Sequence, residues 1–541
     1  MKKGLMLGMA LAMVTTVFAG CSQGNEAGTG NSESTKPGTT TSEQPAANAS
    51  EKPQKVRVSL WDRSNSPDGT KITDSIVVKW LQEKALEEAN LEVEYVTLPR
   101  SQETDKLNVW MASGEAPDIV ITYNQDLMFQ YAEQGGLWEL DDLLDQYGPD
   151  IKNLIQPSLE AAGTYKGVRY GIPALRMNRN SGPSMKIRQD WLDKLGMQAP
   201  TTLDELYTVL KAFKEQDPGG IGKENVVPWA LPAINQSMKG FLFGPMWGAG
   251  VNSDGPGLVD LYMPKGNLVD GQFHSAIDTP EGKEFFAFLN KLYKEGLISK
   301  EFVTDVNGQM FTQHLTSGQA GFVDSNEDPY VMTTNTRKSV PEAKWVTVMP
   351  FKQKDGSQYM DKVPANGLLN LIPKSTKNPE AAVKYLNFLA KNITVVQSGF
   401  EGQHYNVEDG LRVPIDIEKN KKEIDWYLGD LNLLTQGYMS SPSKEQMLKL
   451  NPDPEYAELM SPHYEQFEKF GGSGKGIDSP RPVAQEKSVN LTKYAYEALS
   501  KAVIAPDFEK EWANVLDGWY KLGGKEFDQE ITEKLAELNN R

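Results

Sequence analysis

The sequence predicts an α/β protein of at least two lobes, preceded by an export segment and a linker. Three observations lead to this prediction. Strand and helix signals alternate from Val56 onward, as expected for a parallel sheet with helices on its faces. The composition changes near residue 55, from small polar residues to the mixture of an ordinary globular protein. The stretch from Val56 to Arg541 is also long enough for more than one hydrophobic core.

The first predicted elements follow one another as strand, helix, strand, helix and strand. Residues 56–61 alternate in polarity, 72–89 have helical apolar spacing, 91–98 are strand-like, 105–113 are helical, and 117–123 read as a buried strand. This βαβαβ order implies parallel strands joined by helices. Ligands of such sheets bind beyond the carboxyl ends of the strands, so the loops after the first and third strands are candidate sites.

The first twenty residues are typical of a secretory signal peptide. Lys2 and Lys3 precede an apolar run from Leu5 to Phe18, which is short for a membrane span. Ala19-Gly20-Cys21 then places small residues directly before the only cysteine, as a lipoprotein signal peptidase requires, although Phe18 stands where leucine is usual. We expect residues 1–20 to be removed and Cys21 to carry a lipid anchor. The alternative is a lone buried or reactive thiol, and either way no internal disulfide can form.

Residues 21–55 are predicted to be the lipidated cysteine followed by a disordered linker. Ser22 to Lys52 contains no aromatic or branched aliphatic residue, so it cannot form a core. A flexible chain of about thirty residues spans roughly 30 Å, enough to hold a folded unit clear of a membrane. A disordered tail without a tether is the alternative interpretation.

The charge and hydropathy of the chain exclude two classes of function. The formal net charge is -17 at pH 7, so a nucleic acid would meet a repulsive field, and no basic cluster interleaved with aromatic residues offsets it. After the signal segment no apolar run approaches twenty residues, so we expect no membrane span in the mature protein.

Several sequence blocks, in order along the chain, carry a resemblance to a known family. The blocks are 108–118 (NVWMASGEAPD), 136–143, 170–173, 187–196, 200–202, 212–218, 293–302 (YKEGLISKEF), 372–390 and 399–405. With these blocks the chain is similar to family 1 extracellular solute-binding proteins, in particular to the large LplA-like lipoprotein branch related to alginate-oligosaccharide binders. Each block alone also has ordinary capping explanations.

The resemblance implies a type 2 periplasmic-binding-protein fold, two α/β lobes that close around a ligand by hinge motion. We expect residues 56–175 to form lobe one, with about 345–400 returning to it, and 176–340 to form lobe two. Residues 401–541 should be a helical region packing across both lobes. The resemblance further implies a monomer with no cofactor, held on the outer face of a Gram-positive cell membrane, with an oligosaccharide ligand and ABC transporter permease subunits as partners.

One loop departs from the pattern of the alginate-binding relatives. They hold calcium in a loop that corresponds to residues 217–228 here, but Gly219 and Ile221 replace its two asparagine ligands, and Asn225 and Val226 replace its two acids. Calcium takes six to eight oxygen ligands, several of them carboxylates. We therefore predict that the calcium site is lost, and the sequence indicates no metal-binding residues.

Sugar recognition needs flat apolar rings beside polar groups that pair with hydroxyls, buried together in a cleft. The candidates with this mixture are Trp61, Asp62 and Arg63 after the first strand, Tyr123, Asn124 and Asp126 after the third, Arg176 and Asn178 near the first lobe crossing, Trp247 in a glycine-rich segment, and Glu401 and His404.

Each of these candidates has a structural alternative. Trp61 could cap the sheet edge, Trp247 could anchor a surface loop, Arg63 and Arg176 could form surface pairs, and His404 could be a hydrogen-bonded structural residue. Trp80, Trp110 and Trp191 lie on helical apolar stripes and are predicted to be core residues. Trp519 is expected at the surface.

A secreted carbohydrate-active enzyme is the rival class of function. The chain has no G-x-S-x-G or H-E-x-x-H motif, its four histidines lack metal-ligand spacing, and the glycine-rich 471–476 lacks the P-loop pattern. A catalytic pair of carboxylates remains an alternative, because the sequence does not show how far apart two carboxylates lie in the folded protein. A binding protein that serves a sensor is a further alternative. We expect a binding protein without enzymatic activity.

Overall fold

The computed structural model describes residues 52–67, 70–177, 180, 182, 184–234, 266–353, 356–361, 365–439, 441–472, 477 and 479–539. The described residues from Lys52 onward form one compact unit. Within the described ranges, no helix combines the length and the apolar character that crossing a membrane requires.

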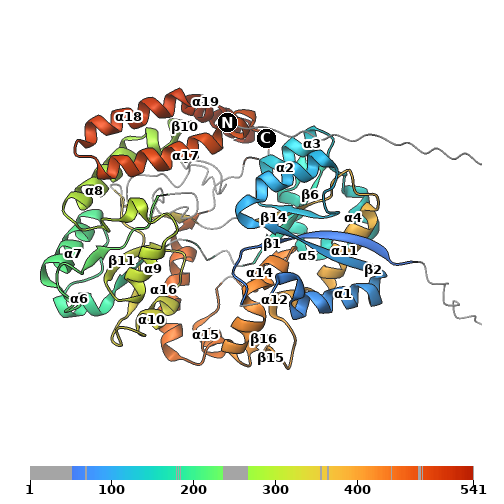
Figure 1. Cartoon of the computed structure of the whole chain (residues 1–541), viewed down its shortest axis with the longest axis horizontal. Coiled ribbons are helices and arrows are strands. Elements are labelled where there is room, and N and C mark those ends of the chain that lie inside the picture. The colour runs from blue at the N-terminus through green and yellow to red at the C-terminus, as the bar shows by residue number, and fades with distance from the viewer. Residues whose placement is uncertain are drawn as a thin grey trace, which may run out of the picture. The chain divides into compact units, whose positions relative to one another are not determined.

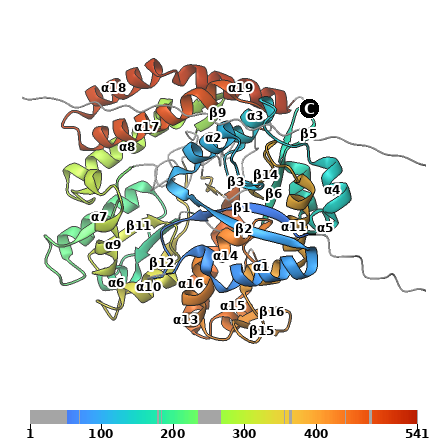
Figure 2. The same ribbon diagram turned by 45° about the vertical axis from the view of Figure 1, so that its right-hand side comes forward.

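The predicted βαβαβ order is present at the start of the compact unit. It consists of β1 (Gln54–Asp62), α1 (Ile76–Ala89), β2 (Leu91–Pro99), α2 (Glu103–Ser113) and β3 (Val120–Thr122). β1 and β2 lie side by side in parallel register, and β1 makes a parallel bridge to the chain just before β3 (Figure 2). The first and third strands therefore end near one another, as the sequence indicates.

The first lobe is completed by strands from much later in the chain. Its four-stranded sheet has the order β17-β6-β14-β3, with β6 at Gly171–Arg176, β14 at Asn366–Leu371 and β17 at Thr435–Gln436. β14 runs antiparallel to both β3 and β6, whereas β17 is parallel to β6. One hydrophobic cluster accordingly joins residues 56–174 to residues 368–434.

The second lobe is built on a separate four-stranded sheet. Its order is β12-β7-β11-β8, formed by β12 (Trp345–Val348), β7 (Ser184–Arg188), β11 (Ala320–Ser325) and β8 (Val227–Trp229). We expected the chain to return to lobe one from about residue 345, and this boundary is wrong. β12 pairs with β7 along its whole length, so the return to the first sheet comes with β14.

The remaining elements flank these sheets or form hairpins. The helices are α3 (Gln125–Glu133), α4 (Asp141–Tyr147), α5 (Pro149–Ala161), α6 (Gln189–Leu195), α7 (Leu203–Gln216), α8 (Pro280–Lys294), α9 (Gln309–Thr316), α10 (Pro329–Thr336), α11 (Pro379–Lys391), α12 (Ile393–Ser398), α13 (Ile417–Asn420), α14 (Trp426–Leu431), α15 (Lys444–Leu450), α16 (Pro454–Phe470), α17 (Pro482–Ile504), α18 (Phe508–Lys521) and α19 (Gly524–Asn539). The short strands are β4 (Thr164–Tyr165), β5 (Val168–Arg169), β9 (Gly266–Val269), β10 (Gln272–Ser275), β13 (Met360–Asp361), β15 (Tyr405–Glu408), β16 (Leu411–Pro414) and β18 (Gly471–Gly472).

The C-terminal region divides between the two cores. Residues up to Leu434 belong to the first hydrophobic cluster, whereas α17, α18 and α19 contribute to the second, which joins residues 185–360 to 467–535 (Figure 1). Trp519, expected at the surface, is buried there because the apolar side chains of α18 recur at helical spacing on its inner face. Trp110 and Trp191 are buried as predicted, and Trp80 is half-buried against the first cluster.

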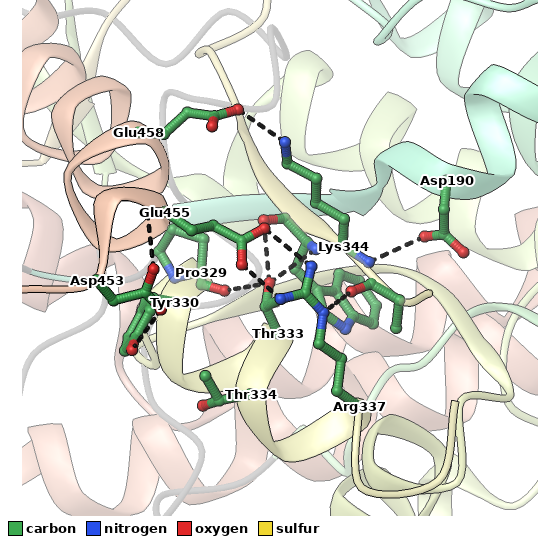
Figure 3. A network of polar contacts seen from close by, with 12 residues as sticks. Asp190, Pro329, Tyr330, Thr333, Thr334, Arg337, Lys344, Asp453, Glu455 and Glu458 are labelled. Atoms are coloured by element: carbon green, nitrogen blue, oxygen red, sulfur yellow. Dashed lines mark hydrogen bonds and ion pairs between the residues drawn. The ribbon is translucent and has the colours of Figure 1, made fainter. Parts of the chain in front are cut away.

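Polar contacts tie α16 to the second lobe. Arg337, which follows α10, bonds Glu455 of α16 through both ends of its guanidinium, one bond being 2.9 Å (Figure 3). Lys344 Nζ lies 2.7 Å from a carboxylate oxygen of Glu458, one helical turn further along α16. Because two charged pairs hold successive turns, α16 is fixed to α10 and to the start of β12.

Candidate functional site

Two aromatic rings stack where β1 and β3 end. The ring centroids of Trp61 and Tyr123 are 5.0 Å apart with an interplanar angle of 18°. The guanidinium of Arg100, which directly follows β2, lies 4.5 Å from the centroid of Trp61 and 5.4 Å from that of Tyr123. Trp61 is only 1% exposed, so its ring is covered in this conformation. Such a buried environment is expected if Trp61 caps the edge of the sheet. Stacking of a sugar ring on Trp61 stays a prediction.

Arg63 already has a carboxylate partner. Its Nε lies 2.7 Å from Oδ2 of Asp430, and its Nη2 lies 2.8 Å from Oδ1, which makes a two-pronged contact. The hydrogen bonds to Asp430 raise the pKa of Arg63, while burial opposes them. The Asp430 side chain is buried and that of Arg63 is about two-fifths exposed (41%). The free edge of Arg63 can therefore still face a ligand.

Arg100 and Glu103 form a second charged pair that our sequence reasoning missed. Arg100 Nη1 bonds Oε2 of Glu103, and Thr122 Oγ1 donates to Oε1 of the same buried carboxylate over 2.6 Å. These contacts join the ends of β2 and β3. Arg100 follows the second predicted strand, so the rule that selected Trp61 and Tyr123 could have found it.

Arg176 differs from the other two arginines because its contacts are with neutral groups. The half-buried side chain ends β6, its Nε donates to Oε1 of Gln436 over 3.3 Å, and its guanidinium lies 5.7 Å from the centroid of Tyr123. Gln436 Nε2 in turn bonds the Tyr123 hydroxyl. Within the described part of the chain no carboxylate contacts Arg176, and burial lowers its pKa. It is a partly desolvated cation beside an aromatic ring.

Asn124 and Asp126 have structural partners. Asn124 is the N-cap of α3, and its side-chain oxygen accepts from the backbone N–H groups of Asp126 (3.0 Å) and Leu127 (3.3 Å). The Asp126 carboxylate forms a buried ion pair with Arg481, with Nη2 and Oδ2 2.9 Å apart. Arg481 immediately precedes α17, so this pair connects the first lobe to the helices of the second core.

The block around residues 401–404 is held together internally. His404 is fully buried; its Nδ1 accepts from the backbone N–H of Phe400 at 3.0 Å, and its Nε2 lies 3.3 Å from a carboxylate oxygen of Glu423. Burial lowers the pKa of His404, although Glu423 opposes this. The contacts match the structural alternative for His404, whereas Glu401 is exposed.

Three further candidates complete the comparison with the sequence. Asp62 is exposed, and its Oδ1 accepts from the backbone N–H of Ser64 at 2.8 Å. Asn178 and Trp247 lie outside the described residues. The structure thus groups Trp61, Arg63, Tyr123 and Arg176 within one strand-end cluster.

A buried polar group lies where β11 ends in the second lobe. Lys186 is fully buried, and its Nζ donates to the carbonyl of Ser325 at 2.5 Å. Burial lowers the pKa of Lys186 to about 8, and the charge of Asp324 opposes this shift. His463 of α16 is also buried; burial and the charge of Lys186 lower its pKa to about 3. No local sequence pattern indicates this group, because its members come from three distant segments.

The loop that replaces the calcium site is closed by its own backbone. The two carboxylate oxygens of Asp217 accept from the N–H groups of Ile221 (3.0 Å) and Gly222 (2.8 Å). Asn225 Nδ2 donates to the carbonyl of Ile221 at 2.8 Å. Asp217, one of the two acids of this loop beside Glu224, is thereby engaged, and loss of calcium binding stays a prediction.

Comparison with known proteins identifies the family. The model of the family described as bacterial extracellular solute-binding protein matches residues 71–394. This chain belongs to that family. The predicted resemblance is therefore confirmed.

Relatives of this solute-binding protein match it over most of their length. It is 27% identical over 497 residues to lipoprotein LipO of Bacillus subtilis, covering 87% of this chain and 94% of the relative. It is 26% identical over 468 residues to the polygalacturonan/rhamnogalacturonan-binding protein YtcQ of the same organism, covering 83% and 86%.

A solved structure confirms the fold class. The alginate-binding protein AlgQ2, crystallised without calcium, aligns over 90% of this chain and 98% of its own, with a TM-score of 0.68 and 22% identity. At this identity the likeness concerns the fold alone. The solute-binding protein accordingly has the two-lobed α/β architecture of periplasmic solute-binding proteins.

Proposed function

We propose that this solute-binding protein captures an oligosaccharide bearing carboxylate groups and delivers it to an ABC importer from the outer face of the membrane. The observation that carries the proposal is the environment of Arg176. A half-buried guanidinium that contacts an amide and a tyrosine ring has donors to offer an incoming anion. Its neighbours Arg63 and Arg100 are already paired with the carboxylates of Asp430 and Glu103. Among the described residues of the cluster, Arg176 is therefore the arginine whose positive charge is left for a ligand.

The chemistry of the cluster suits a uronic sugar. A guanidinium binds a carboxylate through two parallel N–H groups, and a tyrosine ring offers a flat surface to the C–H face of a sugar. Both groups stand at the carboxyl ends of strands, where ligands of open α/β sheets bind. The name of the relative YtcQ supports the same class of ligand, since polygalacturonan is a polymer of a uronic acid.

Calorimetric titration of a short oligogalacturonide and a neutral fructo-oligosaccharide of equal length tests the ligand class. We expect the acidic sugar to bind the wild type more tightly, and Arg176→Ala to lose about thirtyfold in affinity, about 2 kcal/mol, as a hot-spot residue does. Arg176→Lys should recover part of the loss, because it keeps the charge but not the fork. Arg57→Ala is the matched control, since Arg57 lies on β1 toward its other end.

The outcomes separate the parts of the proposal. If Arg176→Ala binds the acidic sugar like wild type, the carboxylate contact lies elsewhere. If the wild type prefers the neutral sugar, the proposal of an oligosaccharide ligand is supported, but the proposal that this ligand bears carboxylate groups is refuted. If no sugar raises the unfolding temperature of the wild type, carbohydrate binding itself is refuted, because a ligand of the folded state must stabilise it.

We further propose that Cys21 anchors the protein through a lipid. The motif before Cys21 and the name of the relative LipO support this anchor. Cys21→Ala should move the protein from the membrane fraction to the medium of a Gram-positive host. Equal retention of the variant and the wild type would rule out the lipid anchor. Delivery to an importer predicts that deletion of the protein abolishes uptake of the ligand, whereas a sensor partner predicts unchanged uptake.

A further inference from the structure

Three side chains with metal-ligand chemistry meet near the C-terminus. They are His274 of β10, Asp278 at the end of a short 3-10 helix (Ala276–Asp278), and Asp528 of α19. One nitrogen or oxygen atom of each lies within 4.8 Å of the corresponding atoms of the other two. The histidines lack metal-ligand spacing along the chain, but the tertiary fold places one of them beside two carboxylates.

Hydrogen bonds to the two carboxylates hold them in place. Asp528 is buried and accepts from Ser275 twice, from the backbone N–H at 3.1 Å and from Oγ at 2.5 Å. The Tyr520 hydroxyl bonds Oδ1 of Asp278. Outer hydrogen bonds of this kind orient the carboxylates that ligate metals, and each carboxylate oxygen keeps a further lone pair for an ion.

The two carboxylates of this trio would also be stabilised by a positively charged partner. Two carboxylates this close repel one another, most strongly where one of them is buried. Among the described residues no lysine or arginine pairs with Asp278 or Asp528, and no hydrogen-bond partner contacts the ring of His274. A bound cation or a retained proton can remove the repulsion.

We propose that His274, Asp278 and Asp528 bind a divalent transition-metal ion such as Zn²⁺. Zinc accepts imidazole nitrogen together with carboxylate oxygen and binds readily through three protein ligands, with water completing the shell. Calcium and magnesium prefer shells made of oxygen alone, which this trio does not offer. The site is separate from the Asp217 loop and from the strand-end cluster.

The position of the trio gives the ion a structural role. His274 and Asp278 flank Ser275 at the end of the β9–β10 hairpin, whereas Asp528 lies far along the chain on the last helix (Figure 1). The hairpin is already linked to α19 by the backbone N–H of Phe273, which donates to Oγ1 of Thr532 at 2.8 Å. The metal adds a further link to this bond and to those between Ser275 and Asp528, so its binding should stabilise the folded state.

Titration of chelator-treated protein with ZnCl₂ tests the proposal. We expect one ion per chain, a rise in unfolding temperature with Zn²⁺, and at least about a tenfold loss of affinity in His274→Ala and in Asp278→Asn. Asp517→Asn, on the exposed face of α18, is the matched control and should bind zinc like wild type. Oligosaccharide affinity and circular dichroism verify that each variant is folded.

The other outcomes overturn the proposal. Absence of stoichiometric zinc binding means that a retained proton balances the two acids. Zinc binding that survives both His274→Ala and Asp278→Asn places the ion elsewhere on the protein. A site that takes Ca²⁺ in preference to Zn²⁺ contradicts the role assigned to the imidazole. If His274→Ala fails to fold, Asp278→Asn decides, because it preserves size and removes only charge.

Discussion

The ion pair between Asp126 and Arg481 is the clearest test of how the two cores are joined. Arg481 leads into α17, whose residues from Ala484 onward belong to the second core, whereas α3 belongs to the first. Both side chains are largely buried, with 3% of the Arg481 side chain and 11% of the Asp126 side chain exposed. Asp126→Asn preserves size, removes one charge, and leaves the guanidinium in a site that water scarcely reaches.

The expected cost follows from this burial. Removal of one partner of a buried pair destabilises a protein by about 3–5 kcal/mol, because the remaining charge is left uncompensated. The asparagine oxygen can still accept one hydrogen bond, and Arg481 has further contacts, so we expect about 3 kcal/mol. Replacement of both residues, in Asp126→Leu with Arg481→Met, should be less destabilising than Asp126→Asn alone, because both charges of the buried pair are then removed.

Urea unfolding followed by circular dichroism measures these differences, with the midpoint and the slope compared between variants. Asp517→Asn is the control, since its partner Lys521 is exposed and the pair lies on the surface of α18. The reasoning is refuted if Asp126→Asn unfolds at the same urea concentration as this control. It also fails if the double variant is less stable than either single variant, because burial of charge would then not be the cause.

Three further predictions concern stability, pH and calcium. The folded state holds His463 neutral down to a pKa of about 3, while the unfolded chain takes up a proton near pH 6.5, so stability should fall as the pH drops below about 6, by up to about 1.4 kcal/mol per pH unit. Urea midpoints between about pH 7 and pH 5 should show a smaller drop for His463→Gln than for wild type. Trp61→Ala should cost about 3–5 kcal/mol of unfolding free energy without any ligand, since the ring is buried against Tyr123; a cost below about 1 kcal/mol would mean that the ring is free. Calorimetry with CaCl₂ should give no stoichiometric signal at the Asp217 loop, and a signal lost in Asp217→Asn would contradict us.

The local pattern of the sequence predicted the first strands and helices well. Alternating and helical periodicity reflect which side chains face a core, and this is settled within a few residues. The strand-end rule therefore led to Trp61, Tyr123 and the arginine after β1. It could not show that Trp61 would be covered by Arg100, because stacking depends on how two loops approach one another.

The contact partners of the site residues could not be predicted from the sequence. Asp430, Gln436 and Arg481 contact Arg63, Arg176 and Asp126, respectively, from more than two hundred residues further along the chain. Nothing in a local pattern specifies such pairings, since they arise from the crossing of the chain between lobes. The assignment of β12 failed for the same reason, because a strand signal does not say which sheet the strand will join.

The interleaved order of the first sheet has a consequence for how the chain can fold as it is made. β3 and β6 both pair with β14, so each strand lacks this neighbour until residues 366–371 have emerged, and β17 arrives later still. A chain that emerges N-terminus first therefore exposes two unpaired strand edges until these later segments arrive. Such edges are templates for aggregation. A fragment that ends before β14 should accordingly precipitate rather than form a separate lobe. The first lobe is protected from aggregation with other chains only when β14 and β17 have paired with its earlier strands.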